Sequence, residues 1–192
     1  MAAPMIVKCP DVVIAGSLIT KEKRHEMFGA VAGGAGSSGP EKFQRVQIIM
    51  GTGYPCPKTN MRINLRTHTL KDIAHPNTSH DGFDYSENFD GLQIVNAIRL
   101  YLNLKCVVGS GGSQTRTLRE VYWFLEGQLQ YLVNTDDTTV FFANILDGDE
   151  AHDCMSKFEY LLSMPEFAAK RHRVYVGDLK GYFDWFKGVV GG

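Results

Sequence analysis

The C-terminal half of the chain alternates between runs of residues typical of strands and runs typical of helices. Residues 100–108 form an apolar run that contains one lysine, Lys105, and predict a buried strand. A long helix is expected to begin near Gln114, because the apolar positions that follow recur at helical spacing. These positions are Leu118, Val121, Tyr122, Leu125, Leu129 and Leu132. Residues 138–146 predict a second buried strand.

The pattern continues to the end of the chain. Asp149 is expected to cap a helix over residues 150–163, and residues 173–176 predict a short strand. Asp178 should then cap a final helix, whose aromatic side chains are Tyr182, Phe183, Trp185 and Phe186. Because strands and helices alternate, we expect an α/β fold with a mixed central β-sheet flanked by helices.

The N-terminal part of the chain predicts a separate segment before the main domain. Residues 11–32 are expected to be helical, and residues 33–40 are rich in glycine and predict a loop or linker. We therefore divide the chain into an N-terminal helical segment with its linker, residues 1–40, and one globular domain, residues 41–192. Within that domain, residues 43–50 predict a strand, and residues 61–68 alternate between polar and apolar positions as a half-exposed strand does.

Charge is balanced over the whole chain but is distributed unevenly along it. The formal net charge is −1, which argues against a protein covered in positive charge but allows a local basic patch. Between Lys42 and Lys71 the chain has four lysines and arginines and no acid, and from Asp72 to Asp90 it has five acids and no lysine or arginine. This switch predicts a site that grips phosphate beside a divalent cation. Two solvated faces of opposite charge are an equally acceptable explanation.

Other compositional features narrow the class of protein. The four cysteines are scattered and none forms a CxxC pair, which disfavours a zinc site and indicates a cytoplasmic protein. No run of 18 apolar residues is present, so no membrane span and no membrane partner are expected.

Lys105 is the residue that most needs a chemical explanation. An unpaired ammonium group inside a strand is costly to bury, so it should have carboxylate or phosphate partners. Glu87 and Asp90 are the nearest acids upstream, in the turn that precedes the strand. An acid in a turn can bind a cation. A lysine on the next strand can place a positive charge beside a phosphate or a water molecule.

The order of these residues resembles the core of PD-(D/E)XK nucleases, and type II restriction endonucleases in particular. Asp90 precedes Lys105 by fifteen positions, and a glycine-rich corner and a long helix follow; the matching stretches are FDG, NLK and GGSQTR, within residues 46–146. The resemblance implies a restriction-endonuclease-like sheet and Mg²⁺-dependent hydrolysis of DNA. It further implies double-stranded DNA as the partner and a homodimer that cuts a short palindrome.

One position departs from the family pattern, because Asn103 stands where the family has an acid. An amide oxygen is a weaker metal ligand than a carboxylate, although Asn103 remains a candidate ligand. Some restriction endonucleases place the missing acid on the following helix, where this chain has Glu120. Glu87 and Glu120 are equal candidates for the missing ligand, with Gln114 behind them. In the default alternative, Glu120 is simply an exposed helix residue.

The resemblance also assigns expected roles. Asp90 would hold Mg²⁺, with Glu87, Glu120 or Asn103, and Lys105 would orient the attacking water and stabilise charge on the phosphate. DNA contacts are expected from basic and polar residues on the predicted strand, corner and helix. They are Arg62, Arg66, Ser113, Gln114, Arg116 and Arg119.

Two other functions remain open on the sequence alone. The stretch GSGGSQT follows a strand and begins a helix, as loops that bind nucleotide phosphates do, although it lacks the lysine of a P-loop. A DNA-binding protein that has lost catalysis is the other alternative, because Asn103 replaces the expected acid.

Overall fold

A mixed four-stranded sheet is the centre of the protein. The computed structural model describes residues 19–28 and 38–192. The strands lie in the order β3 (Gly91–Val95), β4 (Ile98–Cys106), β5 (Val140–Asp147) and β6 (Val174–Gly177). β3 and β4 are antiparallel neighbours, whereas β4, β5 and β6 run parallel. The prediction of an α/β fold with a mixed central sheet is confirmed.

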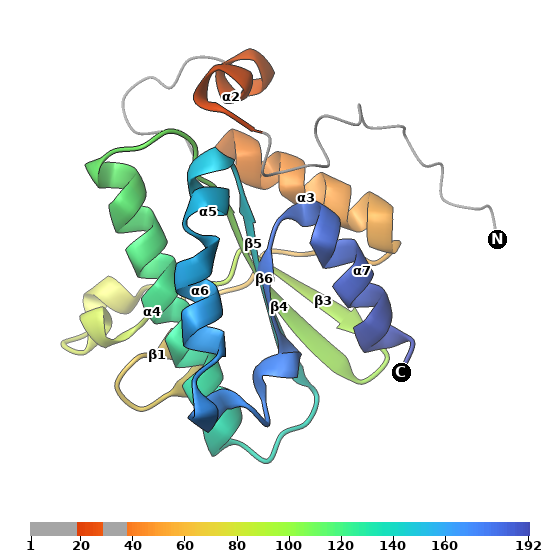
Figure 1. The fold of residues 1–192 in the computed structure, drawn as a ribbon. Helices are drawn as coiled ribbons and strands as arrows, with labels where there is room; N and C mark the ends of the chain where they lie inside the picture. Colours follow the sequence, from red (N-terminus) through yellow and green to blue (C-terminus); the bar gives the residue numbers. More distant parts are fainter. Residues whose placement is uncertain (1–18, 29–37) are drawn as a thin grey trace.

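Helices cover both faces of this sheet (Figure 1). The connections from β4 to β5 and from β5 to β6 place helices on one face. These are α4 (Gly112–Asn134), α5 (Asp149–Asp153) and α6 (Met155–Leu162). The opposite face is covered by α3 (Ser38–Thr52) and α7 (Leu179–Val190). The short helix α2 (Lys21–Phe28) lies near one end of the sheet in Figure 1.

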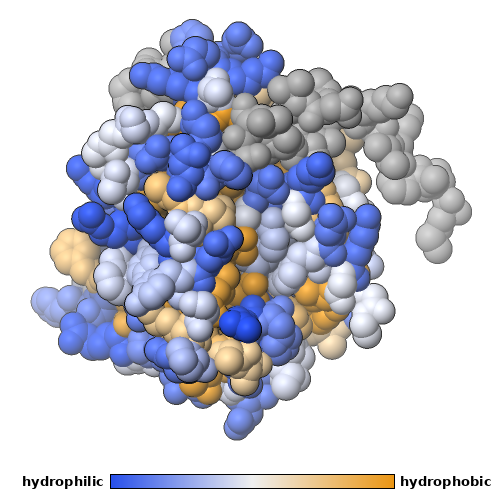
Figure 2. Space-filling model, viewed as in Figure 1, coloured by the Kyte–Doolittle hydropathy of each residue, from blue (hydrophilic) through white to orange (hydrophobic). Residues whose placement is uncertain are grey.

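The alternation of side chains along β4 explains why both faces are apolar. Leu100, Leu102 and Leu104 are buried with α3 and α7, whereas Tyr101 is buried with α4 and α6. Successive residues of a strand point to opposite faces, so a strand covered on both sides is apolar at nearly every position. Figure 2 shows apolar side chains gathered along the middle of one side of the molecule, between hydrophilic surfaces.

A separate hairpin packs beside α4. Its strands are β1 (Met61–Asn64) and β2 (Thr69–Asp72). The prediction of one strand over residues 61–68 is therefore wrong in its second half, where the chain turns. Asn64 stabilises the turn, because its Oδ1 accepts hydrogen bonds from the amides of Arg66 and Thr67, both at 2.9 Å, and its carbonyl accepts one from the amide of His68 at 2.7 Å.

Two short 3₁₀ helices lead from the hairpin to β3. They are η2 (Pro76–Thr78) and η3 (Gly82–Asp84). The chain then reaches Glu87 and Asp90, so this segment delivers both acids to the edge of the sheet. None of the helices in the described ranges has the length and apolar character that a bilayer-spanning helix requires.

The predicted strand over residues 43–50 is wrong, because the structure has the helix α3 there. The apolar trio at residues 48–50 is typical of a strand, but only Ile48 of the three is buried. Gln44 and Ile48, four residues apart, form the buried face of the helix. The predicted linker over residues 33–40 also ends too late, since residues 38–40 already belong to α3; residues 33–37 lie outside the described residues.

Most other predicted elements are confirmed with small changes. The strands over residues 100–108 and 138–146 correspond to β4 and β5, and Asp178 caps α7 by accepting a hydrogen bond from the Gly181 amide at 2.8 Å. The expected helix over residues 150–163 is interrupted at Cys154, and its N-cap is Gly148 rather than Asp149. Of the predicted helix over residues 11–32, the structure describes α2 as helical, and residues 11–18 and 29–32 lie outside the described residues.

Candidate active site

Three carboxylates surround the ammonium group of Lys105 at the end of β4. Its Nζ lies 3.0 Å from Oε2 of Glu87 and 3.9 Å from Oε1 of Glu41. Asp90 is the third acid and contributes electrostatically to the same cluster. The lysine side chain is largely buried, so the carboxylates provide the compensation that the sequence predicted it to need.

Asp90 is held directly beside this lysine by the pairing of β3 with β4. Its amide donates to the carbonyl of Leu102 at 2.7 Å, and its Oδ2 accepts from the amide of Leu104 at 2.7 Å. The fifteen positions between Asp90 and Lys105 are therefore the length of one hairpin. Within the described part of the chain, Oδ1 of Asp90 accepts no hydrogen bond, which leaves one carboxylate oxygen open to a ligand.

Helix α3 supplies the acid that the sequence analysis missed. Glu41 lies in its first turn, and Gln44 and Arg45 follow one turn later. Arg45 donates to the carbonyls of Cys56 and Asp90, which attaches the helix to the start of β3. This contact depends on Gly91, since a Cβ there would lie 2.4 Å from Sγ of Cys56.

Burial and neighbouring charges together shift the pKa values of the groups in the cluster. Burial raises the pKa of Asp90 above the usual range of the carboxyl group, despite the opposing effect of Lys105. Burial also raises the pKa of Glu41, and the nearby Asp90 raises it further. For Lys105, burial alone would lower the pKa, but Asp90, Glu87 and Glu41 together outweigh it and raise the pKa. The raised pKa keeps Lys105 protonated, and burial is the main reason that the carboxyl groups of Asp90 and Glu41 are harder to ionise.

The cluster has a net negative charge, which would attract a cation. With every group ionised, Glu41, Glu87 and Asp90 carry three negative charges against the two positive charges of Lys105 and Arg45. In residues 19–28 and 38–192, no three histidine, cysteine, aspartate or glutamate side chains lie close enough to hold a metal ion as they stand. Mg²⁺, however, needs only one or two carboxylates and retains several waters. The open oxygen of Asp90 and the carboxylate of Glu41 are the two candidate donors for such an ion.

A buried polar contact fixes the position of α3 relative to the cluster. Nε2 of Gln44 donates to the carbonyl of Lys105 at 3.0 Å and to Oδ2 of Asp147 at 2.7 Å. Asp147 ends β5, and its Oδ1 accepts from the amide of Leu179 at 3.1 Å. Burial raises the pKa of Asp147 to about 6, although the hydrogen bond from Gln44 opposes the shift. Gln44 thus joins α3, β4 and β5 at the edge where Glu41 meets Lys105.

Asn103 does not take part in the cluster through its hydrogen bonds. Its Nδ2 donates to Oδ1 of Asn144 at 3.2 Å, and Gln128 of α4 donates to the same oxygen at 2.9 Å. Oδ1 of Asn103 is buried and has no hydrogen-bond partner among the described residues. Asn103 therefore belongs to an interior amide network, and its predicted role as a metal ligand stays a prediction.

Glu120 is not brought to the cluster by any described interaction. It is exposed on α4, and no hydrogen bond or ion pair joins it to Asp90 or Lys105 in the described ranges. Ser113 and Gln114 lie in the first turn of the same helix, where the Ser113 hydroxyl bonds Oε1 of Gln114 at 2.7 Å. Their predicted contacts with DNA, like those of the exposed Arg116 and Arg119, stay predictions.

The two arginines of the hairpin are engaged within the protein. Arg62 donates to the carbonyls of Ile73 at 3.1 Å and Ser86 at 2.9 Å, so its guanidinium group anchors the connection to β3. Arg66 is exposed and forms a bidentate salt bridge with Asp84, with both N–O distances at 3.0 Å. Part of the charge switch along the sequence is thus explained by pairing between the basic strand and the acidic turn.

In the glycine-rich corner, a backbone amide donates a hydrogen bond to a carboxylate. Gly109 adopts a positive φ of 68°, and its amide donates to Oδ1 of Asp149 at 2.9 Å. Gly148 has a φ of 108°, and a Cβ there would lie 2.1 Å from the carbonyl oxygen of Val107. An amide already occupied by an aspartate is a poor phosphate donor, so this geometry does not favour the nucleotide-phosphate alternative.

The sequence does contain a signal for the missed acid. Ser38-Gly39-Pro40-Glu41 has a serine three positions before a glutamate and a proline between them, which is typical of the start of a helix. Recognition of that helix start would have replaced the strand over residues 43–50 with a helix and put Glu41 in its first turn.

No protein-family model, curated protein or solved structure matches this chain.

Proposed function

We propose that this protein is a Mg²⁺-dependent endonuclease that hydrolyses phosphodiester bonds of DNA, with a core of the restriction-endonuclease type. The observation that carries the proposal is the position of Lys105. Its ammonium group lies between the carboxylates of Glu41 and Glu87, one strand away from Asp90. Metal-dependent phosphodiester hydrolysis requires a cation ligand and a positive charge beside the attacking water, and this cluster contains both.

In this proposal Asp90 and Glu41 hold Mg²⁺, and Glu87 is the third acid of the site. Bound Mg²⁺ supplies a Lewis acid for the phosphate oxygen and lowers the pKa of a bound water. Lys105 orients the attacking water and stabilises negative charge that develops on the phosphate. Glu41 would replace the acid that the family pattern has where this chain has Asn103. Glu87 and Glu120 are the competing candidates for that ligand.

Two copies of such a site are needed to cut both strands at a palindrome, so the proposal includes a homodimer. The exposed Arg116 at the N-terminal end of α4 is the clearest candidate for a contact with DNA phosphates, together with the neighbouring Ser113 and Gln114. Arg62 is a weaker candidate, because the protein already uses its guanidinium donors.

The test is cleavage of supercoiled plasmids of mixed sequence by the full chain, with Mg²⁺ or with EDTA. We expect discrete fragments that require Mg²⁺, and a loss of at least about 100-fold in rate for Asp90→Asn and Lys105→Met. Glu41→Gln, Glu87→Gln and Glu120→Gln distinguish the three candidate ligands, since only the true ligand should give a comparable loss. Glu166→Gln, at an exposed position of the short helix η4 (Pro165–Phe167), is the matched control.

Binding of the metal is measured separately by titrating Mn²⁺ into the wild type and into Asp90→Asn. Weaker binding by the variant supports the metal site even if the DNA sequence that is cut has not been found. Intact plasmids with both Mg²⁺ and Mn²⁺, together with unchanged metal binding in Asp90→Asn, would refute the proposed function.

A further inference from the structure

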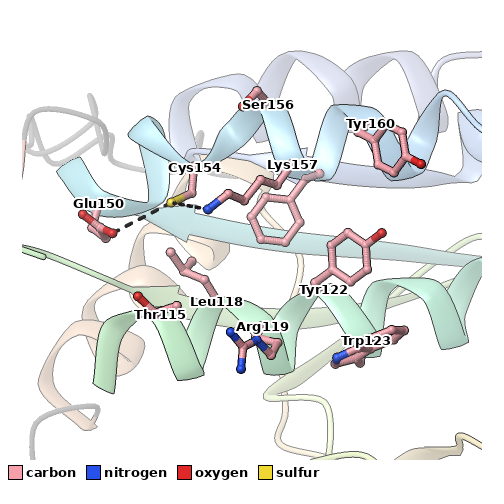
Figure 3. Close-up of a pocket in the computed structure, with 11 residues that line it drawn as sticks. Thr115, Leu118, Arg119, Tyr122, Trp123, Glu150, Cys154, Ser156, Lys157 and Tyr160 are labelled. Atoms are coloured by element: carbon pink, nitrogen blue, oxygen red, sulfur yellow. Dashed lines mark hydrogen bonds between the residues drawn. The ribbon is translucent and has the colours of Figure 1, made fainter. Parts of the chain in front are cut away.

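A groove of about 530 Å³ lies between α4 and the α5–α6 pair, on the face of the sheet that those helices cover. Figure 3 shows that one wall is formed by α4 and the other by α5 and α6. The volume falls in the range of clefts that hold small ligands or one or two units of a polymer. The groove is separate from the cluster around Lys105, since none of the three clustered acids lines it.

Aromatic side chains form much of both walls. Tyr122 and Trp123 project from α4, and Tyr160 projects from α6 (Figure 3). Trp123 is 53% exposed and Tyr160 is 64% exposed, which are high values for such large rings. Tyr122 is held in place by edge-to-face contact with Trp123, with ring centroids 5.4 Å apart. Trp123 and Tyr160 are therefore accessible rings on which a flat ligand can stack.

A cation stands on each wall without a carboxylate partner. Arg119 of α4 forms no hydrogen bond or ion pair within the described part of the chain. The ammonium group of Lys157 on α6 contacts Sγ of Cys154 at 3.9 Å and has no ion pair with a described residue. Among the described residues that line the groove, Glu150 is the one acid, and its Oε1 lies 3.8 Å from Sγ of Cys154. The groove therefore carries one net positive charge beside its aromatic walls.

We propose that this groove binds a segment of single-stranded DNA. Bases stack on Trp123 and Tyr160, and backbone phosphates are held by Arg119 and Lys157. The combination of accessible rings and unpaired cations is what single-stranded nucleic acid requires, because every base has a face that stacks and every linkage carries a charge. The choice of DNA rather than RNA rests on the proposed function; the binding itself does not depend on cleavage.

The charge of the groove favours this ligand over a second copy of the chain. At an interface between two copies of this groove, each copy brings the cations Arg119 and Lys157 but only the acid Glu150 from the described lining, so positive charge stays uncompensated. A phosphate backbone satisfies both cations at once.

The test measures binding of a fluorescein-labelled single-stranded oligothymidylate by fluorescence anisotropy, with the full chain in EDTA. We expect Kd to rise at least about tenfold in Arg119→Ala/Lys157→Ala and about fivefold or more in Trp123→Ala. Lys180→Ala/Lys187→Ala removes the same charge from exposed positions of α7, on the other face of the sheet, and should leave Kd within about twofold. Affinity of the wild type should fall steeply with added salt.

Several results would overturn the inference. These are absence of binding, an equal loss in the α7 control, or no effect of Trp123→Ala. Loss of binding in Asp90→Asn would place the DNA in the active site instead. Sedimentation would identify a self-interface if the wild type is a dimer and Trp123→Ala is a monomer. Because the assay contains no free Mg²⁺, failure of cleavage and failure of this binding are separate outcomes.

Discussion

The buried carboxyl group of Asp147 makes the stability of this protein depend on pH in a way that one substitution can isolate. Only 2% of the residue is exposed, and burial raises its pKa from 3.8 to about 6. Because the folded-state pKa lies above the unfolded-state value, the folded state retains a proton that the unfolded state has released. Stability from this group is therefore greatest below about pH 4 and is lost as the pH rises through about 6.

The shift of about two pKa units corresponds to about 3 kcal/mol in total, of which about 2 kcal/mol falls between pH 4.5 and pH 7.5. Asp147→Asn removes the charge and keeps the shape of the side chain. Its new amide group faces Nε2 of Gln44, so a hydrogen bond is lost at every pH, at a cost of about 1 kcal/mol. This constant cost does not affect the slope of stability with pH.

The assay is urea unfolding of wild type and Asp147→Asn at pH 4.5, 6 and 7.5, followed by circular dichroism. We expect the difference in unfolding free energy between the two proteins to change by about 2 kcal/mol across this range, in favour of the variant at high pH. Glu159→Gln, at an exposed position of α6, is the control and should change with pH as the wild type does. Parallel curves for wild type and Asp147→Asn would show that the carboxyl group is not buried as described.

Three further expectations concern other parts of the structure. The raised pKa values of Asp90 and Glu41 mean that protons compete with Mg²⁺, so the Mg²⁺ concentration for half-maximal cleavage should rise as the pH is lowered. Gly148→Ala combines a positive φ with a Cβ 2.1 Å from a carbonyl oxygen and should lower the unfolding free energy by at least about 2 kcal/mol, measured in urea. Tyr182→Phe removes a buried 2.8 Å hydrogen bond to Oε1 of Gln93 and should cost about 1–3 kcal/mol in the same assay, whereas an unchanged midpoint would show that Gln93 has another partner.

The sequence predicted the parts of the fold that local patterns determine. The strand that ends near Lys105 is buried on both faces, so it is apolar at nearly every position. The helix with the stripe from Leu118 to Leu132 is buried on one face, so its apolar residues recur every three or four positions. The point where β1 ends and β2 begins is harder to predict from the sequence. Residues 65–68 continue the alternation of β1, but the hydrogen bonds of the Asn64 side chain and carbonyl, together with a positive φ at His68, make them a turn.

The part of the candidate site that lies close together in the sequence was predicted. Asp90, Glu87 and Lys105 are close in sequence, and one hairpin brings them together. Glu41 lies 64 positions before Lys105 and reaches it through packing of α3 on the sheet, which no local pattern specifies. The apolar residues 48–50 favoured a strand because a helix with one well-buried residue among three consecutive apolar ones resembles a strand in a short window.

The position of Glu41 in the site depends on how helix α3 packs on the sheet. Glu41, Gln44 and Ile48 lie at intervals of three and four residues, so one face of the helix carries an acid, a positioning amide and a core anchor. A helix turns by about 100° for each residue. Insertion of one residue between Glu41 and Gln44 would leave the amide and the core anchor in place and rotate the acid away from Lys105. The helix would thus tolerate such a change as a structural element while the site lost one of its acids.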